Sequence, residues 1–117
     1  MGTSKSTEAE RKFTAGVSIF SGRPDPTWPI SAALGSKLEK LYGELERHEG
    51  GATQAPPLGY RGAFLRDDAG NEWSAYRGVV TFNSEARKDD NRAFERELVT
   101  SAPDGLIPPA LLAAEFD

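Results

Sequence analysis

Residues 60–82 read YRGAFLRDDAGNEWSAYRGVVTF, and this stretch decides the fold. Two segments rich in tyrosine, phenylalanine, tryptophan and valine, residues 59–67 and 71–82, flank the polar sequence Asp68-Ala69-Gly70. Aromatic and β-branched segments on either side of a short glycine-containing turn predict a β-hairpin. If Gly70 takes the left-handed position of a three-residue loop, Asp67 pairs with Asn71, and this pair fixes the register of the two strands.

The hairpin contains a short internal repeat, Tyr60-Arg61-Gly62 on one segment and Tyr76-Arg77-Gly78 on the other. The predicted register places each tyrosine opposite a glycine, which its ring can cover. One face then collects the side chains suited to packing under helices: Tyr60, Phe64, Tyr76, Val80 and Phe82. The other face holds Arg61 opposite Arg77.

Two guanidinium groups about 6 Å apart repel by about 0.7 kcal/mol in water and about 3 kcal/mol at an effective dielectric constant of 20. We therefore expect a negative group beside Arg61 and Arg77. An internal carboxylate such as Asp25 or Glu85 would make the pair structural. A ligand carboxylate or phosphate would make it a binding site, because arginines bind such anions through paired hydrogen bonds.

On the N-terminal side, Phe13, Ala15, Val17 and Ile19 alternate with other residues, which is the period of a strand. Residues 1–12 are polar and show no apolar period, so we expect a disordered tail ahead of a single domain, residues 13–117. A chain of this length buries enough surface for one hydrophobic core.

Residues 21–29 contain three prolines and a glycine, which predicts a loop. Arg23, Asp25 and Trp28 project from it, and a stiff loop loses little entropy when its side chains bind a partner. They are therefore candidate ligand-binding residues. Alternatively, Trp28 packs on the core and an Arg23–Asp25 ion pair fixes the turn.

Three helices complete the predicted order. Leu34, Leu38, Leu41 and Leu45 form one stripe of a helix over 31–48, capped by Ser31, which would pack on the aromatic face of the hairpin. After a loop to Asp89, Asp90 or Asn91 caps a second helix that buries Phe94 and Leu98 and ends near Ser101. A short last helix starts at Pro109 and carries Leu111, Leu112 and Phe116. The expected fold is α+β, a two-layer, three-stranded and largely antiparallel sheet with helices on one face, in the order β-α-β-β-α-α.

The amino-acid composition excludes several kinds of functional site and partner. The 117 residues include no cysteine and one histidine, His48, which excludes thiolate or multi-histidine metal sites and a cysteine nucleophile. We expect no metal or other cofactor. A net charge of −4 disfavours nucleic acid, and no apolar run is long enough to span a membrane. Since no secretory signal is recognisable, we expect a cytoplasmic protein.

The segments Ser21-Gly22-Arg23-Pro24-Asp25-Pro26-Thr27-Trp28 and Leu58-Gly59-Tyr60-Arg61-Gly62 resemble segments of small, uncharacterised bacterial proteins. In those proteins the first segment more often has Asn at the position of Asp25. The resemblance implies no activity and no site residue.

Three functional hypotheses follow. The first is a binding or accessory module that engages an anionic small molecule, a peptide or a partner protein through residues 21–28 and the face bearing Arg61 and Arg77. The second is a small cofactor-free enzyme in which the arginines hold an anionic substrate and Asp25 or a tyrosine transfers a proton. The third is a structural homodimer formed through the open sheet face.

Overall fold

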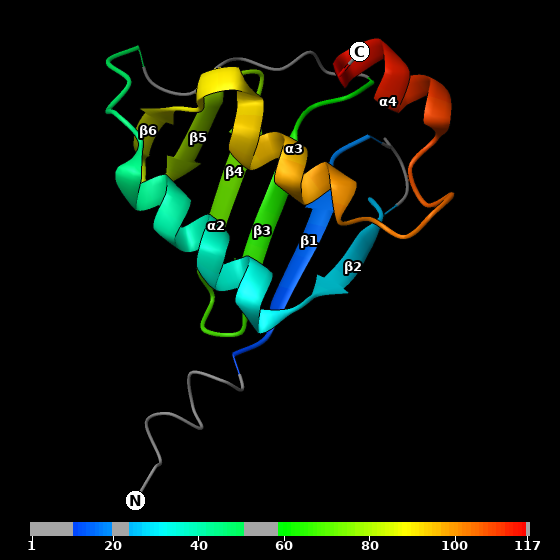
Figure 1. Cartoon of the computed structure of the whole chain (residues 1–117), viewed down its shortest axis with the longest axis horizontal. Coiled ribbons are helices and arrows are strands. Elements are labelled where there is room, and N and C mark those ends of the chain that lie inside the picture. Colours follow the sequence, from blue (N-terminus) through cyan, green and yellow to red (C-terminus); the bar gives the residue numbers. More distant parts are fainter. Residues whose placement is uncertain (1–10, 20–23, 51–58, 117) are drawn as a thin grey trace, which may run out of the picture.

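A computed structural model describes residues 11–19, 24–50 and 59–116, which form a sheet with helices on one side (Figure 1). The sheet has six antiparallel strands in the order β2-β1-β3-β4-β5-β6. The strands are β1 (Phe13–Val17), β2 (Thr27–Ile30), β3 (Ala63–Asp67), β4 (Glu72–Tyr76), β5 (Val79–Phe82) and β6 (Glu85–Lys88). The helices are α2 (Ala32–Glu44), the 3-10 turn η1 (Asp90–Arg92), α3 (Ala93–Thr100) and α4 (Pro109–Phe116).

The α+β class is confirmed, but the three-stranded sheet with the order β-α-β-β-α-α is wrong. Residues 27–30 and 85–88 form the two edge strands, and residues 71–82 form two strands instead of one. The predicted hairpin register is correct over its paired length, because Arg66 faces Glu72 and Ala63 faces Ala75.

The second half of the hairpin divides at Arg77-Gly78, which takes positive φ angles of 43° and 94°. Two such residues make the tight turn typical of two-residue hairpins. Tyr76 therefore pairs with Val79, and Val80 and Phe82 lie opposite Ala75 and Trp73. In one continuous strand, Val80 and Phe82 would instead share a face with Tyr76. As a result Val80 and Phe82 face the helices, whereas Phe64 and Tyr76 point to the other face. The single aromatic face predicted for the hairpin is wrong for this reason.

Each edge strand has a sequence that is untypical of a strand, so neither is predicted from the sequence. Pro29 in β2 lacks an N–H, yet it is accommodated because the Val17 N–H donates to Pro26 O, which leaves the backbone of Pro29 pointing away from β1. Strand β6 has the charged sequence EARK. Residues 46–48 run along its outer edge. The His48 N–H donates to Ala86 O at 2.8 Å, and the Lys88 N–H donates to Glu46 O at 2.7 Å.

This edge pairing also explains why α2 ends at Glu44 instead of continuing to residue 48. Leu45 turns into an extended conformation (ψ 150°), and the next three residues run beside β6. The N-terminus of α2 is as predicted, since Ser31 Oγ accepts from Leu34 N–H at 3.0 Å.

Helices α2 and α3 cover one face of the sheet, here called the covered face (Figure 1). The largest fully buried side chains belong to this layer: Trp73, Phe13, Phe94, Leu38, Leu65, Leu98, Glu95, Val17 and Val80. Helix α2 reaches the sheet closely at Gly35, where an added Cβ would lie 2.1 Å from the Phe13 ring. Helix α3 buries Phe94 and Leu98 as predicted and ends at Thr100, and α4 begins at Pro109 as predicted.

The N-cap residue of α3 is Arg92, and the side chain that accepts from the first N–H groups of the helix is Asp89, not the predicted Asp90 or Asn91. The Asp89 carboxylate accepts from the N–H groups of Phe94 and Glu95 at 2.8 and 3.1 Å. The turn η1 separates Asp89 from the helix, with Asn91 in a left-handed conformation (φ 58°). Burial raises the pKa of Asp89 above its ordinary value, although the two N–H bonds oppose this shift.

Residues 1–10 of the predicted tail lie outside the described residues. Arg11 is docked on the domain, where it pairs with Asp67 and Glu39, each at 2.8 Å. No helix among the described residues has both the length and the apolar character needed to cross a membrane.

Candidate ligand site on the open sheet face

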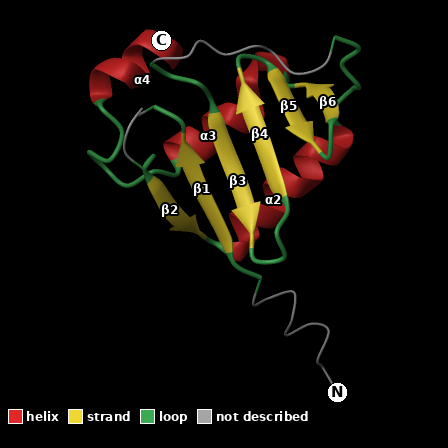
Figure 2. Cartoon of the chain, turned by 180° about the vertical axis from the view of Figure 1, so that it is seen from behind, coloured by secondary structure: helices red, strands yellow, loops and turns green. Residues whose placement is uncertain are grey.

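The second face of the sheet carries no helix in the described part of the chain, and we call it the open face (Figure 2). Its central row follows from the strand register and crosses the sheet through Thr27, Gly16, Phe64, Ser74 and Thr81. Hydroxyl and small side chains therefore dominate this row, in contrast to the apolar residues one position away on each strand.

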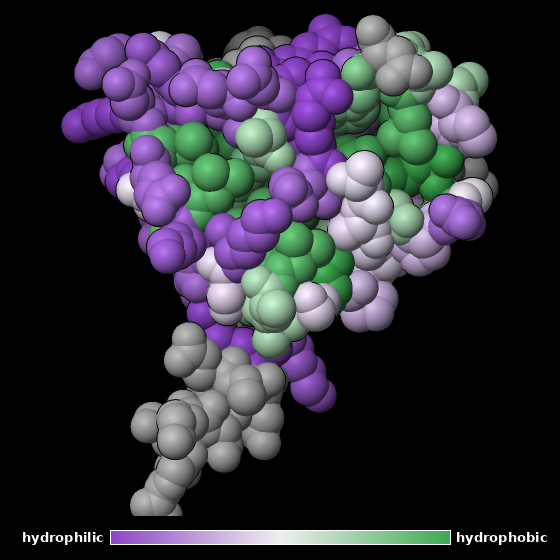
Figure 3. All heavy atoms as spheres, in the orientation of Figure 1, coloured by the Kyte–Doolittle hydropathy of each residue, from purple (hydrophilic) through white to green (hydrophobic). Residues whose placement is uncertain are grey.

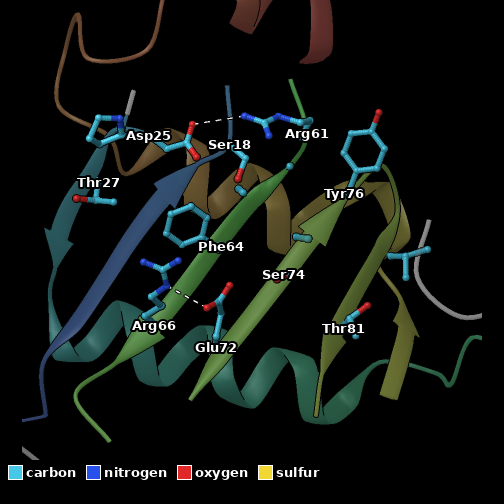
Figure 4. A pocket seen from close by; sticks show the side chains of 15 residues that line it. Ser18, Asp25, Thr27, Arg61, Phe64, Arg66, Glu72, Ser74, Tyr76 and Thr81 are labelled. Atoms are coloured by element: carbon cyan, nitrogen blue, oxygen red, sulfur yellow. Dashed lines mark hydrogen bonds and ion pairs between the residues drawn. The ribbon is translucent and has the colours of Figure 1, made fainter. Parts of the chain in front are cut away.

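The open face is hollowed around this row. The hollow has a volume of about 500 Å³ and is lined by hydroxyl, aromatic and charged side chains, among them Ser18, Thr27, Ser74 and Thr81. Figure 4 shows an ion pair at two sides of it: Arg61 with Asp25, and Arg66 with Glu72. Both signs of charge and several hydroxyl groups thus face the same space.

Arg61 is positioned by an extension of the β1–β3 pairing beyond the strands. Its N–H donates to Ser18 O at 2.8 Å, and Ser18 N–H donates to Gly62 O at 2.9 Å. Regular pairing with β4 stops here because Gly62 has a φ of 114° and lies so close to β4 that an added Cβ would be 2.6 Å from Ala75 O. Arg61 therefore projects at the end of the strand, with 28% of its side chain exposed.

Asp25 lies opposite Arg61, with a distance of 3.8 Å between Oδ1 and Nη2. The same Oδ1 accepts from Ile19 N–H at 2.9 Å, so the carboxylate also fixes the chain after β1. Asp25 is therefore the internal carboxylate that the structural alternative required beside Arg61, and it also borders the hollow.

Arg66 and Phe64 form another part of the lining. The Phe64 ring covers Gly16, whose added Cβ would lie 2.2 Å from the ring. The Arg66 guanidinium stacks 4.3 Å from the Phe64 centroid, and its Nε donates to Glu72 Oε1 at 3.0 Å. About half of the Arg66 and Glu72 side chains is exposed, so both can contact a molecule in the hollow.

The structure brings two of the five predicted site residues into the hollow, Asp25 and Arg61. Trp28 is 3% exposed on the covered face, where its Nε1 donates to Ser101 Oγ at 2.8 Å. Arg77 lies in the β4–β5 turn and pairs with Glu115 at 2.6 Å, and Arg23 lies outside the described residues. The expectation that Arg61 faces Arg77 is wrong, because regular pairing ends at Ala63 and Ala75.

Sequence reasoning did not select Arg66, although the predicted register already placed it opposite Glu72. It also did not select Glu95, whose carboxylate is fully buried beyond the end of the sheet. Glu95 accepts two bonds from Arg92, at 3.0 and 2.9 Å, one from Arg77 N–H at 2.8 Å, and one from the Tyr60 hydroxyl. Burial, followed by the Glu95 charge, raises the pKa of Tyr60, so this hydroxyl remains protonated.

These four bonds satisfy the Glu95 carboxylate with internal donors, which makes it a structural centre. No three histidine, cysteine or acidic side chains gather as a metal site within the residues that the structure describes. Comparisons of the chain with protein-family models, curated proteins and solved structures found no match.

Proposed function

We propose that this protein is a small binding module that holds an anionic, hydrogen-bonding small molecule in the hollow of the open face. The observation that carries the proposal is the placement of Arg61 and Arg66 in one polar hollow on a face without a described helix. Guanidinium groups bind carboxylates and phosphates through paired hydrogen bonds.

The size and lining of the hollow favour a small molecule over a peptide or a partner protein. Its volume of about 500 Å³ lies within the usual range for small-molecule sites. The hydroxyl groups of Ser74 and Thr81 can each donate and accept, so they suit a ligand with its own hydroxyl or carbonyl groups.

The arginines of the hollow are paired with carboxylates, so the protein without a ligand does not leave these positive charges unmatched. Asp25 pairs with Arg61 and Glu72 pairs with Arg66, and both arginine side chains are partly exposed. An incoming anion would meet arginines that are already held in place, so little side-chain entropy is lost.

Binding is favoured over the enzymatic alternative by the role of Asp25. A general base must be able to accept a proton from the substrate. The carboxylate of Asp25 already accepts the Ile19 N–H and faces Arg61. The predicted cytoplasmic location remains part of this proposal and rests on the sequence alone.

The test is titration of the isotope-labelled protein with phosphate, citrate and a hexose phosphate, followed by amide chemical shifts. We expect at least one probe to shift Phe64, Ser74 and Thr81. Arg61→Gln should weaken its binding at least tenfold, whereas Arg47→Gln, which removes an equal charge from an exposed position outside the hollow lining, should not.

Either of two results with the probes would refute the proposal. One is the absence of shifts in the hollow with every probe, and the other is an equal loss of binding in both arginine variants. If the same amides shift with protein concentration alone, the open face is a dimer interface and the homodimer hypothesis replaces ours.

A further inference from the structure

The end of α4 places Glu115 and Phe116 among three arginines that belong to other elements. Arg77 donates to both carboxylate oxygens of Glu115, at 3.2 and 2.6 Å. Arg92 donates to Glu115 O at 2.8 Å, and Arg96 donates to Phe116 O at 3.3 Å. We call Arg77, Arg92, Arg96 and Tyr60 the arginine clasp.

The clasp also surrounds the aromatic ring. Tyr60 meets Phe116 edge to face, with 6.0 Å between centroids and an interplanar angle of 80°. The guanidinium carbons of Arg92 and Arg96 lie 4.3 and 5.4 Å from the centroid of Phe116. Cations at these distances from a ring are attracted by its negative face. The clasp therefore recognises a carboxylate, an aromatic ring and two main-chain carbonyls together.

Contacts that do not involve α4 hold most of the clasp. The buried Glu95 carboxylate fixes Arg92 and Tyr60, and it also accepts the Arg77 N–H. Arg96 Nε donates to Asn91 O at 3.1 Å. Departure of α4 would leave these bonds intact, so Arg92, Arg96 and Tyr60 are preorganised for a segment of the same chemistry, whereas these bonds fix Arg77 only through its backbone.

Helix α4 is less buried than α3, although its Leu111, Leu112 and Phe116 pack against the core. None of its residues is buried, whereas α3 buries four: Phe94, Glu95, Leu98 and Val99. A crevice of about 360 Å³ lies along α3 and α4, lined mainly by apolar groups such as Val99, Leu112 and Phe116. Figure 3 shows apolar surface gathered over α4. An element with so little burial opens more easily than the core.

The anchor before α4 limits where the helix can go. Ile107 is 3% exposed in the core, and Pro108 alone separates it from the first residue of α4. Such a short tether lets the helix swing away but keeps it beside its own domain. Another protein, rather than the α4 of a distant copy, is therefore the better source of a replacement.

We propose that the arginine clasp is a recognition site for a segment of a partner protein that carries a glutamate followed by an aromatic residue. Helix α4 is the resident occupant, which must leave before that segment binds. This site is separate from the hollow of the open face and does not depend on its ligand. A tethered occupant competes at a high effective concentration, so it lowers the apparent affinity for any external segment.

The test uses the full chain and a fluorescent, end-blocked peptide with the sequence of residues 107–117 as the probe. We expect the variant Glu115→Gln/Phe116→Ala, whose own helix is a poor occupant, to bind the peptide at least tenfold more tightly than the natural chain. Adding Arg77→Gln should remove this gain, whereas adding Arg47→Gln should not. A peptide with both clasp-binding residues replaced in the same way should not bind.

Equal binding of the two peptides, or no gain in the double variant, would overturn the proposal. A dimer of the natural chain that dissociates in the double variant would also overturn it, since the occupant would then be a second copy. If the double variant does not fold, hydrogen exchange of the natural chain decides. If the amides of α4 exchange faster than those of the sheet, the proposal is supported. If they exchange only when the whole domain unfolds, it is refuted.

Discussion

The two faces of the sheet are built from the same strands, yet they differ in almost every side chain. On β4, Trp73 and Ala75 are buried under the helices, while the alternate residues Glu72 and Ser74 are exposed. On β3, Leu65 is fully buried, while Arg66 beside it is exposed. Because neighbouring side chains on a strand point in opposite directions, stability and ligand contact are assigned to alternate residues. A substitution on the covered face should therefore change stability with little effect on ligand contact, and a substitution on the open face should do the reverse.

The largest expected effect is on the covered face. Leu38→Ala removes a side chain that is fully buried between α2 and the sheet. We expect it to lower the free energy of unfolding by about 2–5 kcal/mol, through lost transfer energy and the cavity left behind. Urea unfolding measures this, and a loss below about 0.5 kcal/mol would show that α2 does not pack through Leu38.

Two glycines offer a matched comparison between the faces. An added Cβ would collide with a phenyl ring at both Gly35 and Gly16, at 2.1 Å from Phe13 and 2.2 Å from Phe64. Phe13 is enclosed at 2% exposure, whereas Phe64, at 7% exposure, borders the hollow and has open space on one side. We expect Gly35→Ala to cost about 1–3 kcal/mol and Gly16→Ala less than half of that, as measured by thermal unfolding. Equal costs would mean that the open face is as rigidly packed as the core.

Asp67 is a charged exception on the covered face, opposite Phe13 in the register. Burial alone would raise its pKa, but bonds from Asn71, from Arg11 and from the Ala69 N–H lower it overall. The stabilisation is therefore complete above the unfolded pKa of about 4 and is lost as the pH falls through the lower folded value. We expect Asp67→Asn to cost about 1–2 kcal/mol at pH 7 and to flatten the acid limb of the stability curve. An unchanged acid limb would contradict this assignment.

The smallest effects on stability are expected in the hollow. Ser74→Ala and Thr81→Val remove exposed or half-exposed hydroxyl groups, so each should change the free energy of unfolding by less than about 0.5 kcal/mol. The same variants should weaken the binding of whichever anionic probe occupies the hollow. A stability loss above about 1 kcal/mol would show that these hydroxyl groups belong to the fold instead.

The elements that sequence reasoning found have a strong local signal. The period of β1, the caps and apolar stripe at the start of α2, the start of α4 and the register fixed by Asp67 and Asn71 are all local features. The elements it missed lack such a signal. Pro29 argues against a strand unless that strand lies at an edge, and Arg77-Gly78 is not among the dipeptides that mark a tight turn most strongly.

The candidate site was found only in part, for a related reason. Asp25 was predicted from its place in a stiff, proline-containing loop, and Arg61 from a register that wrongly placed it opposite Arg77. Trp28 was predicted from the same loop as Asp25 and is buried, because its segment is a strand that turns the ring toward the end of α3. The Arg77–Glu115 pair joins residues 38 positions apart, and nothing in the sequence points to such a contact.

The two described sheet edges each carry a feature that hinders strand addition, and this affects how copies of the protein meet. At one edge, Pro29 interrupts the row of outward N–H groups on β2, and at the other, residues 46–48 already bond β6. An exposed sheet edge with free backbone groups is the usual template for strand addition and fibril growth. With each described edge blocked, this protein can present a polar sheet face to a crowded solution while resisting aggregation by edge-to-edge pairing.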